Sequence, residues 1–155
     1  MHPNQLLIQT FYEAFARKDY RAMGECYHPD ATFIDQAFDL KEAEVPAMWQ
    51  MLCTRGKDLE VTFSNVMADD HHGSADWEAR YSFSQTARKV HNVIHAEFLF
   101  RDGKIWAHTD TFNFHRWAGQ ALGFTGLLLG WTSFFQKKVQ DTAMSNLRKF
   151  MSDRP

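Results

Sequence analysis

The hydrophobic period of the chain changes near Leu59, and this change constrains the fold more than any other feature of the sequence. Before it, apolar residues such as Leu7, Phe11 and Phe15 recur at three- and four-residue spacing, which predicts an amphipathic helix. After it, apolar and polar residues alternate, as they do in β-strands. Helices followed by a run of strands are typical of an α+β fold, in which the helices cover one face of a curved, mainly antiparallel sheet.

The turn and capping signals divide these two regions into elements. After the first helix, Asp19 caps a short helix that runs to Tyr27, and a third helix begins near Pro46 and closes at Gly56. Between them, "ATFID" reads as a short strand. The predicted strands cover 31–35, 59–64, 77–83, 90–101 and 104–116.

The 155 residues fit one domain, 1–155, with a core at 5–117 and a helical extension at 118–155. Hydrophobic residues make up 45% of the chain, enough to fill a core and to line a cavity. In the extension, "GFTGLLLGWTSFF" predicts short helices, and Val139, Ala143, Leu147 and Phe150 mark a last amphipathic helix. Either a lid or a dimer contact would explain this segment.

Charge and cysteine content exclude several classes of function. The net charge of −2, with acidic and basic residues mixed along the chain, predicts no nucleic-acid partner and no membrane partner. The stretch 117–136 is uncharged but contains four glycines, so it is a poor membrane span. Two isolated cysteines and the lack of a basic segment before the first apolar residues favour a cytoplasmic location.

The stretch "DGKIWAHTDTFNFHRW" places two ionisable residues among aromatic ones. A two-residue turn at Asp102 and Gly103 would mix apolar and charged residues on both faces, whereas a three-residue turn including Arg101 sorts them. We therefore predict the three-residue turn. It puts Trp106, His108, Asp110, Phe112 and Phe114 on the inner face, with His108 opposite Ala96 and Asp110 opposite Ile94.

Buried ionisable groups need a partner, a ligand or water, because an unpaired buried charge costs several kcal/mol. His108 and Asp110 are therefore either a structural hydrogen-bonded pair or part of a functional site. The sequence alone leaves both alternatives open.

The order of elements, with the strings "ECYHPDATFID" and "FRDGKI", resembles the nuclear transport factor 2-like superfamily, most nearly its ketosteroid-isomerase-like and SnoaL-like polyketide-cyclase branch. The resemblance covers about residues 5–117. It implies a cone-shaped α+β barrel whose helices and bent sheet enclose an apolar pocket. Many members of this superfamily dimerise through the outer face of the sheet, so a homodimer is expected.

The resemblance also implies site residues. The general base of the isomerases maps to Asp35, while their donor positions fall on Phe11, next to Tyr12, and on Ala96. In the limonene-epoxide-hydrolase branch, a catalytic aspartate maps to Asp110 and a water-holding residue to Asp35. That branch's arginine and second aspartate fall on Trp77 and Ala79, which leaves its catalytic triad incomplete. His108, opposite Ala96, could supply the missing donor.

We predict Asp35, Asp110 and His108 as catalytic residues, although Asp35 could instead be a turn residue before "QAFDL". A second set is predicted to line the substrate pocket: Tyr12, Trp49, Trp77, Tyr81, Asn92 and Phe112. We predict no metal and no cofactor, because His91 and His95 lie on the outward face and no phosphate-binding loop is present.

Three functions are compatible with these residues. The first is an enzyme performing acid-base chemistry, as an isomerase, cyclase, dehydratase or hydrolase, on a small hydrophobic molecule. The second is a protein that binds such a molecule without changing it. The third is a protein-association module. An inner cone filled by side chains would leave His108 and Asp110 no room for a ligand and would contradict the first two functions.

Overall fold

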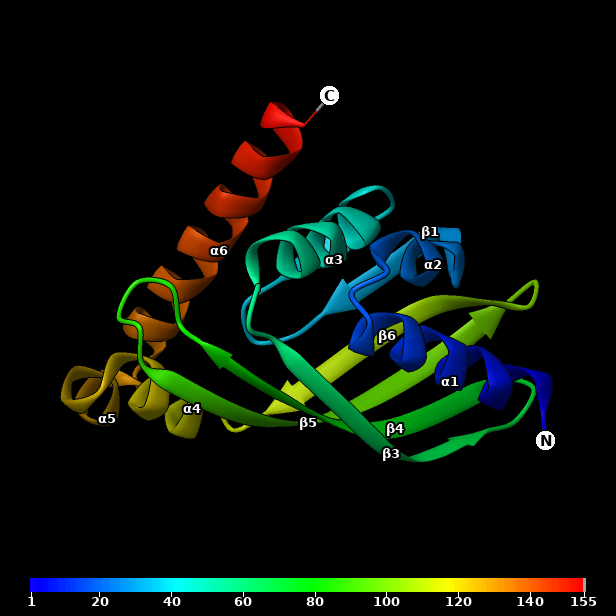
Figure 1. Cartoon of the computed structure of the whole chain (residues 1–155), viewed down its shortest axis with the longest axis horizontal. Helices are drawn as coiled ribbons and strands as arrows, with labels where there is room; N and C mark the ends of the chain where they lie inside the picture. The colour runs from blue at the N-terminus through cyan, green and yellow to red at the C-terminus, as the bar shows by residue number, and fades with distance from the viewer. Residues whose placement is uncertain (155) are drawn as a thin grey trace.

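The computed structural model describes residues 1–154, so only Pro155 of the predicted domain lies outside the described residues, and it has the predicted α+β architecture (Figure 1). The helices are α1 (Pro3–Ala16), α2 (Tyr20–Glu25), α3 (Glu44–Arg55), α4 (Phe114–Leu122), α5 (Phe124–Leu129) and α6 (Ser133–Asp153). The strands are β1 (Tyr27–Ile34), β2 (Asp39–Lys41), β3 (Glu60–Ala68), β4 (His72–Ser82), β5 (Lys89–Arg101) and β6 (Lys104–Phe112).

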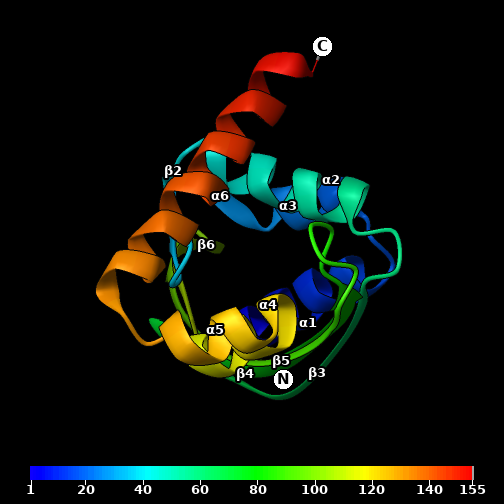
Figure 2. The same ribbon diagram turned by 90° about the vertical axis from the view of Figure 1, so that its left-hand side faces the viewer.

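The strands form one curved, mixed sheet in the order β2-β1-β6-β5-β4-β3. All neighbouring strands are antiparallel except β1 and β6, which are parallel. Helices α1, α2 and α3 lie on the concave side of this sheet, whereas α4, α5 and the start of α6 gather at one end of it (Figures 1 and 2). The core therefore sits between α1, α3 and the inner face of the sheet.

The two main N-terminal helices form where the sequence predicts them. In α1 the predicted stripe, including Phe11 and Phe15, is buried, and the His2 side chain caps the helix by accepting a hydrogen bond from the Asn4 amide. In α3 the predicted residues Val45 and Trp49 are buried. Burial of these apolar stripes against the sheet supplies the main stabilisation of both helices.

The prediction for the β5–β6 turn was wrong. Arg101 pairs directly with Lys104, and both Asp102 (φ 54°) and Gly103 (φ 74°) have positive φ, as a two-residue hairpin turn requires. The register then shifts between Leu99 and Phe100, which is a β-bulge. This bulge, and not a longer turn, brings the apolar residues of both strands to one face.

The bulge also changes which residues face each other. His108 lies opposite Phe98 and not opposite Ala96, and Asp110 lies opposite Ala96 and not opposite Ile94. The predicted grouping of His108, Asp110 and Phe112 on the inner face is nevertheless confirmed, because their partners Phe98, Ala96 and Ile94 share that face.

Two aromatic residues of this stretch lie elsewhere than predicted. Trp106 falls at the bulge and points outward, where the Arg101 guanidinium lies 4.3 Å from its ring, and Ile105 takes the inner position. Phe114 belongs to α4, because the Asn113 side chain accepts a hydrogen bond from the Arg116 amide and starts a helix there.

The C-terminal extension forms the short helices and the amphipathic helix that the sequence predicts. α6 packs against α3 (Figure 1) and buries Leu147. The other predicted residues of this helix face, Val139, Ala143 and Phe150, are half-buried. The Gln140 side chain also donates a hydrogen bond to the Gln36 carbonyl oxygen.

We expect Leu147→Ala to lower the free energy of unfolding by about 2–3 kcal/mol, because it opens a cavity where α6 docks. Chemical denaturation measures the loss, and limited proteolysis should cleave α6 more rapidly in the variant. Asn146→Ala, at the neighbouring exposed position, is the matched control and should change neither. An unchanged cleavage rate in Leu147→Ala would show that α6 is held elsewhere.

Candidate functional site

A chain of buried hydrogen bonds crosses the core and ends at Asp110. The Trp49 indole Nε1 donates to the Tyr27 hydroxyl at 2.9 Å, and that hydroxyl lies 2.7 Å from His108 Nδ1. His108 Nε2 lies 2.8 Å from Asp110 Oδ1, which also accepts a longer bond of 3.5 Å from Trp77 Nε1. We call these five residues the buried relay.

The donors of the relay fix the tautomer of His108. Trp49 can only donate, so Tyr27 accepts from it and points its own proton at His108 Nδ1. Nδ1 is then the acceptor, and the ring proton sits on Nε2, where it donates to Asp110. The opposite tautomer would place an unprotonated ring nitrogen against the carboxylate and leave the Tyr27 proton without a partner.

Aromatic rings enclose the imidazole of His108 on several sides. The ring centroids of Phe98 and Phe33 lie 4.4 and 4.9 Å from it, and those of Phe11 and Trp49 lie 5.8 and 6.1 Å away. The His108 side chain is fully buried and both ring nitrogens are hydrogen-bonded. His108 therefore orients Asp110 and has no free proton for a substrate.

The parallel pairing of β1 and β6 brings the two predicted aspartates together. Ile34, the last residue of β1, pairs with Thr109 of β6 on neighbouring strands about 4.8 Å apart, so Asp35, which directly follows β1, lies beside Asp110. Within residues 1–154, no protein hydrogen bond reaches Asp110 Oδ2. One oxygen of Asp110 is thus held by the relay, and the other is free to accept a proton.

Asp35 lies beside Asp110 and also stabilises a turn. Its Oδ1 accepts hydrogen bonds of 2.7 Å from the amides of Ala37 and Phe38, as an Asx-turn requires. Burial, with a smaller contribution from the charge of Asp110, raises the pKa of Asp35 to about 7 against the lowering effect of these two amides. Near neutral pH, Asp35 is therefore present both as an acid and as a carboxylate.

Two polar atoms near this pair have no hydrogen-bond partner within the described part of the chain. The Tyr12 hydroxyl is buried and unpaired, and so is the Gln36 side-chain oxygen, although the Gln36 amide nitrogen donates to the Phe112 carbonyl. Burial, with the charge of Asp110, raises the pKa of Tyr12 well above its ordinary value, so its hydroxyl remains a donor. Unpaired buried polar atoms are rare and indicate a missing water or ligand.

The other predicted lining residues fall into two groups. Trp49 and Trp77 are buried in the core, and both belong to the relay. Tyr81, Asn92 and Phe112 are half-buried on the inner face, nearer the end covered by α4. The Tyr81 hydroxyl accepts a hydrogen bond of 2.8 Å from Trp117 Nε1 of that helix.

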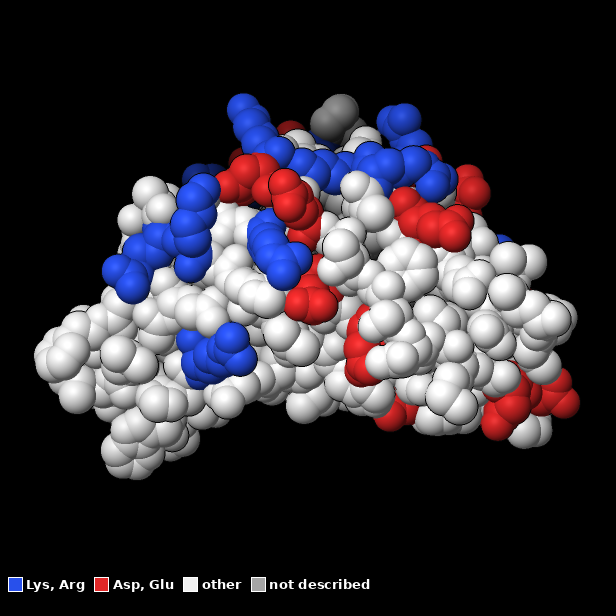
Figure 3. Space-filling model, turned by 60° about the horizontal axis from the view of Figure 1, so that its bottom comes forward, with Lys and Arg blue, Asp and Glu red and all other residues white. Residues whose placement is uncertain are grey.

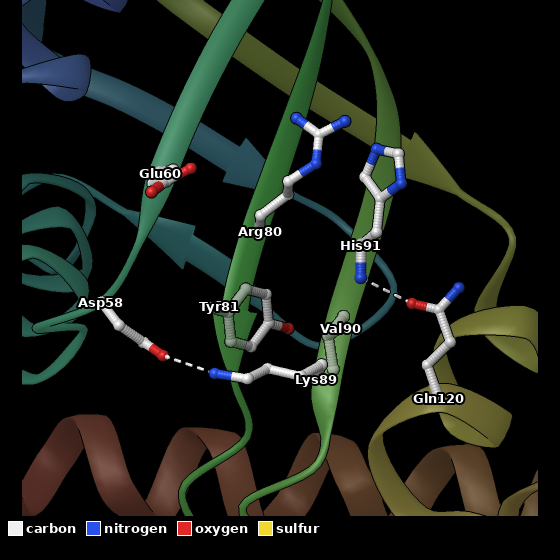
Figure 4. Close-up of a pocket in the computed structure, with 8 residues that line it drawn as sticks. All are labelled: Asp58, Glu60, Arg80, Tyr81, Lys89, Val90, His91 and Gln120. Carbon is white, nitrogen blue, oxygen red and sulfur yellow. Dashed lines mark hydrogen bonds and ion pairs between the residues drawn. The ribbon is translucent and has the colours of Figure 1, made fainter.

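An open groove of about 470 Å³ lies outside this group of residues (Figure 4). Of the predicted site residues, only Tyr81 lines it. Its other lining residues are mostly polar or charged: Asp58, Glu60, Arg80, Lys89, Val90, His91 and Gln120. Asp58 pairs with Lys89 at 3.8 Å, and the Gln120 side chain accepts from the His91 amide at 2.7 Å. A charged, self-paired groove does not fit the predicted apolar pocket.

The remaining histidines of the sheet lie on its outer face and pair with carboxylates. His95 lies 2.7 Å from both Asp76 and Glu97, and His91 lies 2.6 Å from Glu78. Their separation from His108 agrees with the sequence prediction. Among residues 1–154, no three His, Cys, Asp or Glu side chains are grouped as ligands for a metal ion.

Sequence reasoning missed Tyr27 and Gln36. Tyr27 was assigned to the end of the second helix, but the Cys26 carbonyl accepts a hydrogen bond from the Ile105 amide, and Tyr27 begins β1 with its side chain in the core. Pro29 was a usable signal, because it disfavours the helical conformation at His28 and helices usually end at or before that residue. No pattern in the sequence pointed to Gln36.

These features define an α+β cone with a buried His-Asp relay and a pair of neighbouring carboxyl groups. A family model described as the SnoaL-like domain matches residues 8–108, and the chain belongs to this family. The fold is that of the nuclear transport factor 2-like superfamily, as the resemblance predicted. A search of curated protein sequences finds no match.

Solved structures of low sequence identity share the fold. A proposed polyketide cyclase from Xanthomonas campestris is 21% identical, with a TM-score of 0.64 over 76% of this chain and 96% of that one. A Mycobacterium tuberculosis LEH-like epoxide hydrolase is 15% identical, with a TM-score of 0.65 over 82% and 96%. A Catenulispora acidiphila protein with a ketosteroid isomerase-like fold, in complex with trimethylamine, is 13% identical, with a TM-score of 0.64 over 74% and 91%.

We expect Tyr27→Phe to lower the free energy of unfolding by about 1–3 kcal/mol, because it leaves both the Trp49 N–H and His108 Nδ1 buried without partners. Chemical denaturation at neutral pH measures the loss. Tyr20→Phe, which lies outside the relay, is the matched control and should change stability by less than about 0.5 kcal/mol. Equal stability of the two variants would show that the relay contributes nothing to the fold.

We expect Asp35→Asn to raise the free energy of unfolding at pH 8 by on the order of 2 kcal/mol. The pKa of Asp35 rises from 3.8 to about 7 on folding, so the wild-type protein loses stability as the pH rises between these values. The asparagine keeps an oxygen for the Ala37 and Phe38 amides but carries no charge. Denaturation between pH 4 and pH 8 should show a difference that grows with pH, and a constant difference would contradict the raised pKa.

Proposed function

We propose that the chain is an enzyme that transfers protons on a small apolar molecule, with Asp110 as the base and Asp35 as the acid. The observation that carries this proposal is the neighbouring placement of two carboxyl groups in unlike surroundings. Asp110 accepts two N–H donors on one oxygen, whereas the pKa of Asp35 is raised to about 7. Carboxyl groups with such different surroundings are typical acid-base pairs.

In the proposed reaction, Asp110 Oδ2 removes a proton from a carbon next to a carbonyl group, or from a water molecule. Protonated Asp35 gives its proton to the oxygen atom on which negative charge develops. The unpaired Tyr12 hydroxyl donates a hydrogen bond to the same charge. After the step Asp110 is protonated and Asp35 is ionised, so the net charge of the site is unchanged.

His108 and Tyr27 act through Asp110 and do not touch the substrate. The relay fixes the Asp110 carboxylate within hydrogen-bond distance of a ring N–H donor in a water-poor environment. A base held in this way loses little entropy when it reacts. The names of two structural neighbours, a proposed polyketide cyclase and an LEH-like epoxide hydrolase, support acid-base chemistry of this kind.

Non-catalytic binding of a small apolar molecule is the second candidate function. The limited exposure of Asp110, at 4%, favours it, as does the lining of the open groove of Figure 4, which includes neither Asp35 nor Asp110. Binding without turnover requires only the unpaired polar atoms and the half-buried aromatic residues. Loss of catalysis without loss of binding in a carboxyl variant separates the two candidates.

We expect the wild-type protein to open the ring of 5-nitrobenzisoxazole, a small aromatic probe that reacts when a base removes its carbon-bound proton. Asp110→Asn should lower the rate by about a hundredfold or more, because a carboxylate base in an apolar site contributes on that scale. Absorbance of the nitrophenolate product measures the rate. Asp58→Asn, which changes an exposed aspartate, is the matched control.

The role of Asp35 gives this assay a second readout. If protonated Asp35 is the acid, the rate falls as the pH rises above about 7, and Asp35→Asn removes that dependence. A wild-type rate no higher than that of Asp110→Asn would contradict catalysis by this pair. Retained binding of the probe by the inactive variant, measured by calorimetry, would confirm that the site itself is intact.

A further inference from the structure

Six large apolar side chains are exposed at the end of the molecule where α5 lies (Figure 1). Their exposed fractions run from 46% to 81%, and all fall within eleven consecutive residues. We call them the apolar platform: Phe124, Leu127, Leu128, Leu129, Trp131 and Phe134. Elsewhere, exposed large apolar residues such as Met67 and Leu6 lie on separate elements. A cluster of this kind marks an interaction surface.

The helix that carries the platform is held firmly against α4. A Cβ atom at Gly126 would lie 1.9 Å from the Ala118 carbonyl oxygen, so α5 approaches α4 as closely as only glycine allows. The His115 ring Nε2 also donates to the Leu127 carbonyl oxygen at 2.8 Å. These contacts fix one side of α5, and the large side chains are therefore presented outward in a defined arrangement.

The segment of chain that carries the platform contains basic residues but no acidic ones. Residues 111–140 contain no aspartate or glutamate but contain Arg116, Lys137 and Lys138. Lys137 pairs with Asp141 at 3.6 Å. Arg116 and Lys138 have no acidic partner within the described residues. The net charge of −2 for the whole chain conceals this local excess.

A further cation comes from the β4–β5 hairpin. The Arg88 guanidinium lies beside Gly123, at the start of α5, and its Nε donates to the Gln120 carbonyl oxygen. Figure 3 shows the same end of the molecule as an uncharged projection, and the charged side chains nearest to it are blue. The platform is thus an apolar projection bordered by Lys and Arg.

We propose that the apolar platform docks onto the surface of an anionic phospholipid bilayer. A projection tipped with Trp, Phe and Leu inserts into the headgroup region, while the surrounding cations attract anionic lipid. Each cation near such a surface adds affinity, and aromatic side chains favour the interface. The protein lies on the bilayer and does not cross it, and the described residues contain no helix long and apolar enough to span one.

The first test measures binding of the full chain to phosphatidylcholine vesicles with and without phosphatidylglycerol, by flotation. We expect binding to the vesicles that contain phosphatidylglycerol. The combined variant Phe124→Ser, Trp131→Ser and Phe134→Ser should weaken this binding by roughly tenfold or more, because each aromatic side chain buries apolar surface in the bilayer. Met67→Ser, at a residue 67% exposed on β3, is the matched control and should bind like the wild type.

The second test removes charge and leaves the apolar residues in place. Arg116→Gln with Lys138→Gln should weaken binding to the anionic vesicles, by about fivefold for each cation, and added salt should reduce the difference. Lys41→Gln with Lys57→Gln, at exposed positions in β2 and in the turn between α3 and β3, is the control pair. Equal effects of the two pairs would show that binding follows net charge alone and would overturn the proposal.

Two further outcomes would also overturn it. One is failure of the wild-type protein to bind anionic vesicles, and the other is unchanged binding in the platform variant. Sedimentation velocity without lipid tests the competing explanation, in which a second copy of the chain covers the platform. Self-association of the wild type that the platform variant abolishes, together with no binding to vesicles, would support that explanation. The circular dichroism spectrum and unfolding midpoint of each variant confirm that the exposed substitutions leave the fold intact.

Discussion

The hydrogen bond between His108 and Asp110 is the interaction on which the rest of the site depends. Both side chains are buried, and an ionisable group in that position is tolerated only when its polar atoms are paired. Tyr27 from β1, Trp49 from α3 and Trp77 from β4 supply the remaining partners, so the relay ties three further elements to β6. Loss of any one of these elements would leave a buried donor or acceptor without its partner.

The parallel pairing of β1 with β6 adds the second carboxyl group. It places Asp35 beside Asp110, while the turn at Ala37 and Phe38 holds one Asp35 oxygen. Burial keeps the pKa of Asp35 near 7, so the ionised form of Asp35 lowers the stability of the folded protein at higher pH. Unpaired polar atoms at Tyr12 and Gln36 lie in the same part of the structure, which is where we propose that a small molecule binds.

The fold and the inner face could be predicted from the sequence because both follow from periodic burial. Apolar spacing located the helices, and alternation placed His108 and Asp110 together. The register could not be predicted, since a long turn and a tight turn followed by a bulge sort the side chains equally well. Tyr27 was missed because one tertiary hydrogen bond, from the Ile105 amide to the Cys26 carbonyl, decides where β1 begins. Likewise, whole-chain charge did not reveal the cations around the apolar platform.

The protonation state of the His108 ring tests this account most directly. Nitrogen-15 NMR of the protein labelled in its histidines distinguishes the two ring nitrogens by their chemical shifts. The relay predicts that the His108 ring carries its proton on Nε2 and accepts the Tyr27 hydroxyl proton on Nδ1, and that Tyr27→Phe weakens this preference. A proton on Nδ1 in place of Nε2 would contradict the account, because Tyr27 would then be an acceptor and Asp110 would lose its ring N–H donor.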